Sequence, residues 1–293
     1  MRRSIVPIIA FALVVVTACS CSVIQSAKPT ARTKSSAVAR QETSPAPIAD
    51  LPVWRRTDRV ALCTQLGWWD VTHGNVAKPR IALTFDAGGD AGATATILDE
   101  LKAAGLHCTF FVTGQFASDH PDLVRRMAAE GHEVGNHSDT HPKFTTLSEQ
   151  QARSQIEVAD ARISALTGMS TKPYFRFPYG LKSNDLIRLV NSMGYLSASW
   201  TIDDGDWETG ITPDKVHGNA VSHTGPGAII LMHCGSLVEG QVLPRTIVDI
   251  RARGLSIVTL TECLMPGNEV PARSSPGKPV ESVPEHASSS GQP

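Results

Sequence analysis

Two histidines four residues apart, His137 and His141, form the pattern in this sequence that carries the most chemical information. On one helical turn, or across a tight loop, this spacing brings both imidazole rings to the same point. Neutral imidazole is a good zinc ligand, and two such rings supply half of a tetrahedral coordination shell. The chain has ten histidines, so the pair by itself is equally compatible with surface or capping side chains.

Four further polar clusters each lie beside the end of a predicted strand. They occupy residues 84–90, 176–180, 200–207 and 231–233. The first combines a carboxylate with a Gly-rich turn, and the second combines a guanidinium with a rigid Pro-containing turn. The third is rich in aspartate and tryptophan, and the fourth ends in a histidine. Any one of these clusters could be a structural turn or helix cap.

The elements that must position these clusters alternate between short apolar segments and amphipathic helical segments. Predicted strands cover residues 81–85, 108–112, 132–136, 174–177, 196–200, 228–232 and 256–260, and predicted helices cover 91–104, 121–130, 148–166, 184–193, 213–222 and 246–253. This alternation predicts parallel βαβ units. Seven such repeats predict an α/β fold, a distorted or incomplete (β/α)7 barrel with a single catalytic domain. In barrels of this plan the chemistry gathers at the carboxyl ends of the strands.

In their order and at strand ends, the five clusters resemble the motifs of the polysaccharide deacetylases, the NodB-homology family (carbohydrate esterase family four). The resemblance spans roughly residues 80–260. It implies a hydrolase that removes acetyl groups from N-acetylated or O-acetylated sugars. It also implies one divalent metal, usually zinc, with cobalt or another transition metal as alternatives.

The resemblance further implies a role for each matching residue. For catalysis these are Asp86 as general base, Arg176 to orient it, His233 as general acid and Asp206 to tune that acid. For the substrate and the metal these are Tyr179 (backbone N–H for the oxyanion), Trp207 and Leu231 (acetyl pocket), and His137 and His141 (metal ligands). The roles suit amide hydrolysis, which requires a nucleophile, an oxyanion stabiliser and a proton for the leaving amine.

One position departs from the family pattern. The first motif usually carries two adjacent acids, the base and then a metal ligand, but here the second position is Ala87. Asp90 could return through the Gly88–Gly89 turn to serve as the third ligand, or it could be the N-cap of the next helix. A third alternative is a metal site that water molecules complete.

The two ends of the chain differ in composition from the centre. Residues 1–18 combine a basic start with an apolar stretch and end in a motif that resembles a bacterial lipobox, so we expect a lipoprotein signal peptide with lipidation at Cys19. An ordinary cleaved signal peptide is the alternative. Residues 19–50 read as a flexible tether and 265–293 as a disordered tail, which leaves 51–264 as the catalytic domain.

The charge of the chain bears on its partners, and its cysteines bear on whether it contains disulfides. The formal net charge is −1, and no basic cluster interleaves with aromatic residues, so nucleic acid is excluded as an expected partner. Four cysteines follow the signal region at 63, 108, 234 and 263, either as disulfides in one of three pairings or as buried free thiols.

These observations predict an exported lipoprotein on the outer face of the cell membrane, facing the cell wall. The expected substrate is an acetylated envelope polysaccharide, with N-acetylglucosamine or N-acetylmuramic acid of peptidoglycan first. Chitin oligosaccharides and acetylated xylan are alternatives for the same machinery. A non-catalytic, membrane-anchored glycan-binding protein is the alternative from another class, and Ala87 is the residue that favours it.

Overall fold

The computed structural model describes residues 52–266. The predicted signal peptide at 1–18, the lipidation site Cys19, the tether at 19–50 and residues 267–293 of the predicted tail lie outside the described residues. Met265, at the start of that tail, is buried against the core. In the part of the chain between 52 and 266, no helix has both the length and the apolar character needed to cross a membrane.

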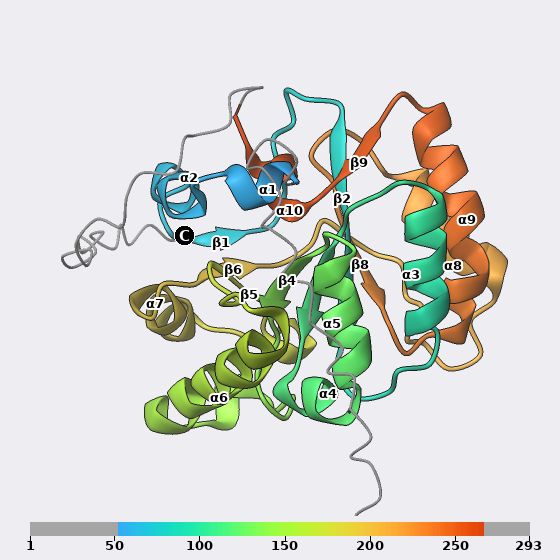
Figure 1. Ribbon diagram of the computed structural model, residues 1–293. Coiled ribbons are helices and arrows are strands. Elements are labelled where there is room, and N and C mark those ends of the chain that lie inside the picture. The colour runs from blue at the N-terminus through green and yellow to red at the C-terminus, as the bar shows by residue number, and fades with distance from the viewer. Residues whose placement is uncertain (1–51, 267–293) are drawn as a thin grey trace, which may run out of the picture. The chain divides into compact units, whose positions relative to one another are not determined.

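The described strands form one nine-stranded sheet in which every pair is parallel. The order is β1-β6-β5-β4-β3-β2-β8-β7, and β9 pairs with the start of β2. The strands are β1 (Asp70–Val71), β2 (Arg80–Ala87), β3 (Thr109–Val112), β4 (Glu133–Asn136), β5 (Tyr174–Phe175), β6 (Leu196–Ala198), β7 (Ile202–Asp203), β8 (Ile229–His233) and β9 (Ser256–Val258). The sheet curls into a half-barrel (Figure 1), which confirms the predicted incomplete (β/α)7 barrel.

All seven predicted strands are present, and β1 and β7 are short additional strands that hydropathy did not reveal. The helices are α1 (Val53–Arg56), α2 (Arg59–Gln65), α3 (Thr94–Ala103), α4 (Gly114–Asp119), α5 (Pro121–Ala129), α6 (Glu149–Thr167), α7 (Asn184–Ser192), α8 (Pro213–Ser222), α9 (Leu237–Ala252) and α10 (Leu260–Leu264). Helix α9 begins well before the predicted start at residue 246, because the Ser236 hydroxyl caps its first turn. Pro244 lies inside this helix, although proline usually marks a helix start.

Strand β2 shows how the pleat divides the two faces of the sheet. Its alternate residues pack in the layer between sheet and helices, and this set comprises Ile81, Leu83, Phe85 and Ala87. Ala82 faces the other way, into an apolar cluster inside the half-barrel. Successive strand side chains point to opposite faces, so Thr84 and Asp86 follow Ala82 on the inner face. The strand therefore carries Asp86 to the carboxyl end of the barrel interior.

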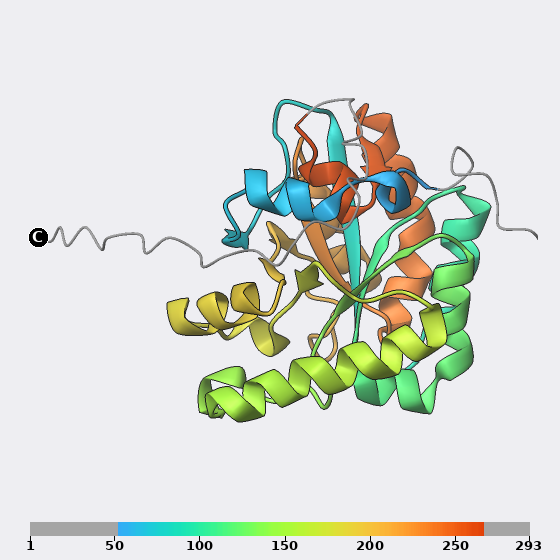
Figure 2. The same cartoon turned by 60° about the vertical axis from the view of Figure 1, so that its left-hand side comes forward.

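The amino end of the half-barrel is closed by α1, α2 and α10, which lie together in both views (Figures 1 and 2). Leu62 and Cys63 of α2 and Leu260 and Cys263 of α10 pack there against inner-face side chains of the strands. Glu133 is buried in the same region, where it accepts hydrogen bonds from the hydroxyls of Thr109 and Thr261. With one end filled, the inner face is open to ligands at its carboxyl end.

The four cysteines of the described residues are free and buried, which agrees with the thiol alternative rather than with disulfides. Burial raises the pKa of the Cys63 and Cys263 thiols to about 12, and it raises those of Cys108 and Cys234 further. A thiol with such a pKa stays protonated and unreactive near neutral pH. These cysteines therefore act as small apolar core residues.

Candidate active site

A cavity of about 790 Å³ opens at the carboxyl ends of the strands. Eight of the residues singled out in the sequence line it, namely Asp86, Asp90, His137, His141, Tyr179, Trp207, Leu231 and His233. The other two, Arg176 and Asp206, are buried directly behind it and contact Asp86 and His233. The fold thus brings together residues from the ends of β2, β4, β5 and β8 and from the loops that follow them.

Asp86 and Arg176 form a buried ion pair at the base of the cavity. Asp86 Oδ1 accepts a hydrogen bond from Arg176 Nη1 over 2.8 Å. The same guanidinium donates to the carbonyls of Ala198 and Ser199, and it lies over the Phe111 ring at 4.1 Å from the centroid. Burial alone would raise the pKa of Asp86, but the charge and hydrogen bond of Arg176 foremost outweigh it and hold this pKa below its usual value. Asp86 is therefore ionised at neutral pH.

The two histidines face one another across the cavity floor. His137 Nε2 lies 3.1 Å from His141 Nε2 and 3.4 Å from Asp86 Oδ2. His137 follows β4 directly, and the loop between the rings bends through positive φ values at Ser138 (70°) and His141 (57°). Positive φ costs energy for residues other than glycine, so the loop keeps the two rings together in spite of local backbone strain.

Both rings are neutral, and one tautomer is defined by its surroundings. Burial lowers the pKa of His137, and burial with His137 as neighbour lowers that of His141 to about 4. His137 Nδ1 lies 2.8 Å from the Arg176 carbonyl oxygen. A carbonyl only accepts, so Nδ1 carries the hydrogen and Nε2 presents its lone pair to the cavity. A second contact that fixes ring orientation in this way is typical of metal-binding histidines.

This donor set fits a divalent transition metal. Two donors about 2.0–2.1 Å from a tetrahedral zinc are roughly 3.3 Å apart, close to the 3.1 Å between the two Nε2 atoms. Two neutral imidazoles whose nitrogens point at each other, beside an ionised carboxylate, are also the ligand chemistry that zinc prefers. The His137–His141 pair is therefore the part of the cavity suited to a metal ion.

Asp86 Oδ2 lies near His137, but no third carboxylate, thiolate or imidazole donor in the described part of the chain lies within 4.8 Å of both histidines. Among residues 52–266, the one group of three such donors within 4.8 Å of one another is Asp204, Asp206 and Glu239. Asp90 is exposed in the cavity wall, where its Oδ1 accepts a hydrogen bond from the Gly92 amide. Ala87 is fully buried and packs between the sheet and the helices. Asp90 as a metal ligand stays a prediction.

His233 lies beside Asp86 on the neighbouring strand β8, and Asp206 is buried behind it. His233 Nδ1 lies 2.6 Å from Asp206 Oδ1, and the His233 amide donates to Asp206 Oδ2 over 2.8 Å. Burial alone would lower the pKa of His233, but the hydrogen bond and charge of Asp206 outweigh it and raise this pKa above its usual value. The imidazole therefore carries a proton near neutral pH, and its Nε2 is free to donate.

The remaining wall is apolar and aromatic. Leu231 is buried two residues before His233 on the inner face of β8, and Trp207 is 61 % exposed at the rim. Tyr179 has a positive φ of 58°, which turns the chain sharply beside His141, and the two rings lie 4.6 Å apart. Trp200 and Asp203 also line the cavity, and Asp203 accepts a hydrogen bond from the Trp207 indole. Both residues belong to the predicted cluster at 200–207, but the sequence assigned no individual role to either.

Comparison with known proteins agrees with this fold. Residues 73–198 match the polysaccharide deacetylase family. The peptidoglycan-N-acetylmuramic acid deacetylase PdaA of Bacillus subtilis is 32 % identical over 193 residues, which cover 65 % of this chain and 73 % of the relative. Its solved structure superposes with a TM-score of 0.64 at 30 % identity, over 69 % of this chain and 87 % of that one.

Two further similar proteins bear on whether a chain with this fold is catalytically active. A peptidoglycan-N-acetylglucosamine deacetylase of Bacillus cereus is 32 % identical over 200 residues, 67 % of this chain and 72 % of the relative. BA3943 of Bacillus anthracis, described as a pseudoenzyme of carbohydrate esterase family four, superposes with a TM-score of 0.64 at 26 % identity, over 67 % and 69 % of the two chains. The chain belongs to the polysaccharide deacetylase family.

Proposed function

We propose that this protein is a metal-dependent hydrolase that removes acetyl groups from an N-acetylated glycan of the cell envelope. The observation that supports it best is the convergence on one cavity of an ionised carboxylate, two facing neutral imidazoles and a protonated imidazole. Hydrolysis of an amide needs a base for the attacking water, stabilisation of the oxyanion and a proton for the departing amine. The cavity offers a group for each need.

Asp86 is the proposed general base. Its Oδ1 is occupied by Arg176, while its Oδ2 faces His137 and the cavity, so one oxygen holds the carboxylate in place and the other can accept the proton of a water. Because Arg176 keeps the pKa of Asp86 low, the group is ready to accept a proton throughout the neutral range.

His137 and His141 would hold the divalent cation, for which zinc is the proposed metal, with Asp90 as the proposed third ligand. When bound, such a cation polarises the acetyl carbonyl and lowers the pKa of water towards about 7. The backbone N–H of Tyr179 is the proposed second donor to the oxyanion. Trp207 and Leu231 would enclose the acetyl methyl group, since both line the cavity with apolar surface.

His233 is the proposed general acid. Asp206 raises its pKa, so at neutral pH the imidazolium can hand its Nε2 proton to the nitrogen of the departing sugar amine. Its side chain is 32 % exposed, while Asp206 is buried behind it, so the acid reaches the cavity and its partner does not. Protonation makes the amine a good leaving group and drives the release of the deacetylated glycan.

Peptidoglycan is the proposed substrate, at its N-acetylglucosamine or N-acetylmuramic acid residues. Two relatives carry names that specify peptidoglycan deacetylation, and a protein with the expected export signal would meet this polymer first. Cys19 is the proposed lipid attachment site that would hold the enzyme on the outer face of the membrane. Deacetylation leaves an amine that is cationic at neutral pH, which changes the charge of the wall.

A non-catalytic glycan-binding protein is the second candidate function. Ala87 in place of an acid and the distance of other donors from the His pair favour it, and so does the similarity to a protein described as a pseudoenzyme. The Asp86–Arg176 and Asp206–His233 pairs favour the enzyme, because a binding protein needs neither a fixed base nor a fixed acid.

Acetate release separates the two candidates. The purified protein is incubated with peptidoglycan and with N-acetylchitooligosaccharides, with and without added zinc or cobalt. We expect acetate in a metal-dependent manner, and peptidoglycan to be the better substrate. If neither glycan releases acetate under any metal condition while glycan still binds, the protein is a binding protein.

Metal content tests the proposed ligands directly. His137→Ala should abolish both stoichiometric metal and acetate release while the circular dichroism spectrum is retained, and His223→Ala, an exposed histidine, serves as the matched control. Asp90→Ala should sharply lower bound metal in elemental analysis. Metal content equal to that of the unmodified protein would reject Asp90 as a ligand.

A further inference from the structure

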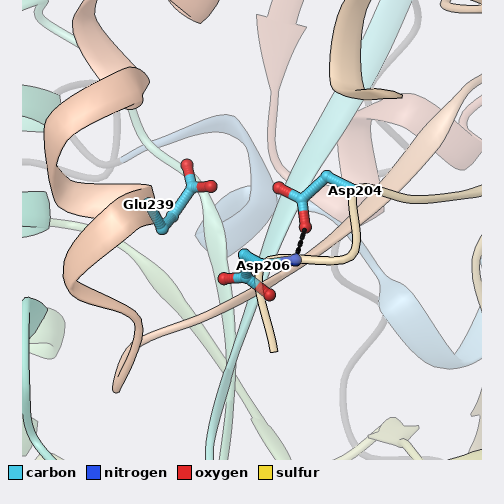
Figure 3. Close-up of side chains that lie close together, drawn as sticks. All are labelled: Asp204, Asp206 and Glu239. Atoms are coloured by element: carbon cyan, nitrogen blue, oxygen red, sulfur yellow. Dashed lines mark hydrogen bonds between the residues drawn. The ribbon is translucent and has the colours of Figure 1, made fainter. Parts of the chain in front are cut away.

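Three carboxyl groups are buried close together (Figure 3), and one of them, Asp206, contacts the proposed acid His233. Asp204 and Asp206 follow β7, and Glu239 lies in the first turn of α9. Donor oxygens of the three groups lie within 4.8 Å of one another, and Asp204 and Glu239 are completely buried. Carboxyl groups this deep are rare unless something compensates their charge.

The hydrogen bonds show which of these groups is already satisfied. Asp206 uses both of its oxygens on His233, one for the ring and one for the backbone amide. Asp204 Oδ1 accepts the Asp206 amide, as the dashed line in Figure 3 shows. Asp204 Oδ2 and both carboxyl oxygens of Glu239 are buried without a hydrogen-bond partner in the described part of the chain.

The charged groups around these oxygens do not compensate for the missing hydrogen bonds. Of the ion pairs between residues 52 and 266, the one that involves this cluster is His233 with Asp206. The titratable groups that face Asp204 and Glu239 are Asp206 from the loop after β7, His233 at the end of β8 and Cys234 just after it. Burial foremost, and then repulsion from the neighbouring acids, raises the pKa of both Asp204 and Glu239 above their usual values.

We propose that Asp204 and Glu239 share one proton, so that the pair carries a single negative charge and leaves Asp206 as the fully ionised partner of His233. Three free oxygens make a poor site for a hard cation, because Ca²⁺ takes six to eight oxygens and Mg²⁺ keeps an octahedral shell with several waters. A proton needs only two facing oxygens. Two carboxyls held close together in a buried site cannot both ionise.

This arrangement makes Asp204 and Glu239 positioning residues for the acid, a role that rests on the proposed function. A proton held between them gives the pair one O–H···O hydrogen bond, which uses two of the three free oxygens, and the pair does not compete for the proton of His233. The Asp204 side chain also accepts the Asp206 amide, which fixes the carboxylate that faces His233. Loss of the pair should therefore change the pKa of the His233 imidazole.

Infrared spectroscopy of the full protein at pH 7 detects the shared proton without any substrate. We expect a protonated-carboxyl C=O band in the unmodified protein that disappears in Glu239→Gln and in Asp204→Asn. Asp185→Asn, which changes a carboxyl that is 88 % exposed, should leave the band in place. Absence of the band in the unmodified protein, or its survival in both variants, would overturn the proposal.

Elemental analysis and NMR complete the test. A stoichiometric metal that Glu239→Gln removes and Asp185→Asn retains would overturn the proposal in favour of a cation site. In NMR titration, the double variant Asp204→Asn/Glu239→Gln should lower the pKa of His233, since it removes the charge of the pair. Glu239→Gln alone, which keeps a donor for Asp204, should lower it less. Equal His233 titration in all three proteins would overturn the positioning role, and an inactive enzyme would leave these readouts unaffected.

Discussion

Asp86 and Asp206 are two buried carboxylates at the same cavity, Asp86 in its lining and Asp206 behind His233, and each is paired with one cation. The partners differ in kind. Arg176 stays charged at any pH that a protein survives, whereas His233 gains or loses its proton near neutrality. One carboxylate is therefore kept ionised by its partner, and the other keeps its partner protonated. The same type of side chain therefore serves as the proposed base in one pair and supports the proposed acid in the other.

The two pairs also differ in how firmly the surroundings hold them. The Arg176 guanidinium is completely buried, donates to two backbone carbonyls and lies over an aromatic ring. The His233 ring is partly exposed and is held by Asp206. Disruption of the first pair should affect folding as well as chemistry, and disruption of the second should affect chiefly the pH dependence.

Arg176→Met should have the largest effect, because it leaves Asp86 as a buried charge without its cation. Breaking a buried pair in this way costs about 3–5 kcal/mol, measured as the free energy of unfolding in denaturant. Arg188→Met is the matched control, since Arg188 belongs to an exposed pair whose contribution is about 0–1 kcal/mol. An equal loss of unfolding free energy in the two variants would mean that the Arg176–Asp86 pair stabilises the fold no more than an exposed ion pair does.

Asp86→Asn should lower kcat/KM for acetate release by roughly 10²–10⁴-fold, the range expected for loss of a general base. Asparagine keeps the size of the side chain and an oxygen for Arg176, so the cavity retains its shape. A pH profile of the residual activity that keeps the acidic limb of the unmodified enzyme would contradict the assignment of Asp86 as the base.

Asp206→Asn should shift the alkaline limb of the kcat/KM profile to lower pH. Asp206 raises the pKa of His233, so without its charge the imidazole loses its proton at a lower pH. The same raised pKa stabilises the fold below about pH 6.5, the unfolded value, and that contribution disappears as pH rises through the folded pKa. Denaturant midpoints measured from pH 5 to pH 9 should therefore depend less on pH in the variant. Parallel curves for the two proteins would argue against this coupling.

Trp207→Phe should have the smallest effect. The indole is largely exposed and donates one hydrogen bond to Asp203, so stability should change by no more than about 0.5 kcal/mol. A rise in KM with little change in kcat is the expected kinetic result, because the side chain would contact substrate in both ground and transition states. A large fall in kcat alone would place Trp207 closer to the chemistry than the structure suggests.

Much of the fold could be predicted from the sequence, because strands and helices depend on local periodicity. The seven apolar segments between residues 81 and 260 are all strands, and Gly and Pro mark most helix ends where expected. The early start of α9 was missed, because Pro244 in its interior is a local signal for a helix start that the cap at Ser236 overrides. Asp86, His137, His141 and His233 could be predicted as cavity residues because each follows or ends a strand of the parallel sheet.

What only the tertiary structure decided is which of these groups touch and in what charge state. Arg176 and Asp86 are 90 positions apart in the chain, and Asp206 and His233 are 27 apart, so neither contact can be read from spacing. The pair of Asp204 and Glu239 had no sequence signal, since each alone resembles an ordinary polar residue near a turn or helix start. Residue type determines what chemistry is available, whereas a pKa depends on burial and on neighbours that only the packing of distant segments brings together.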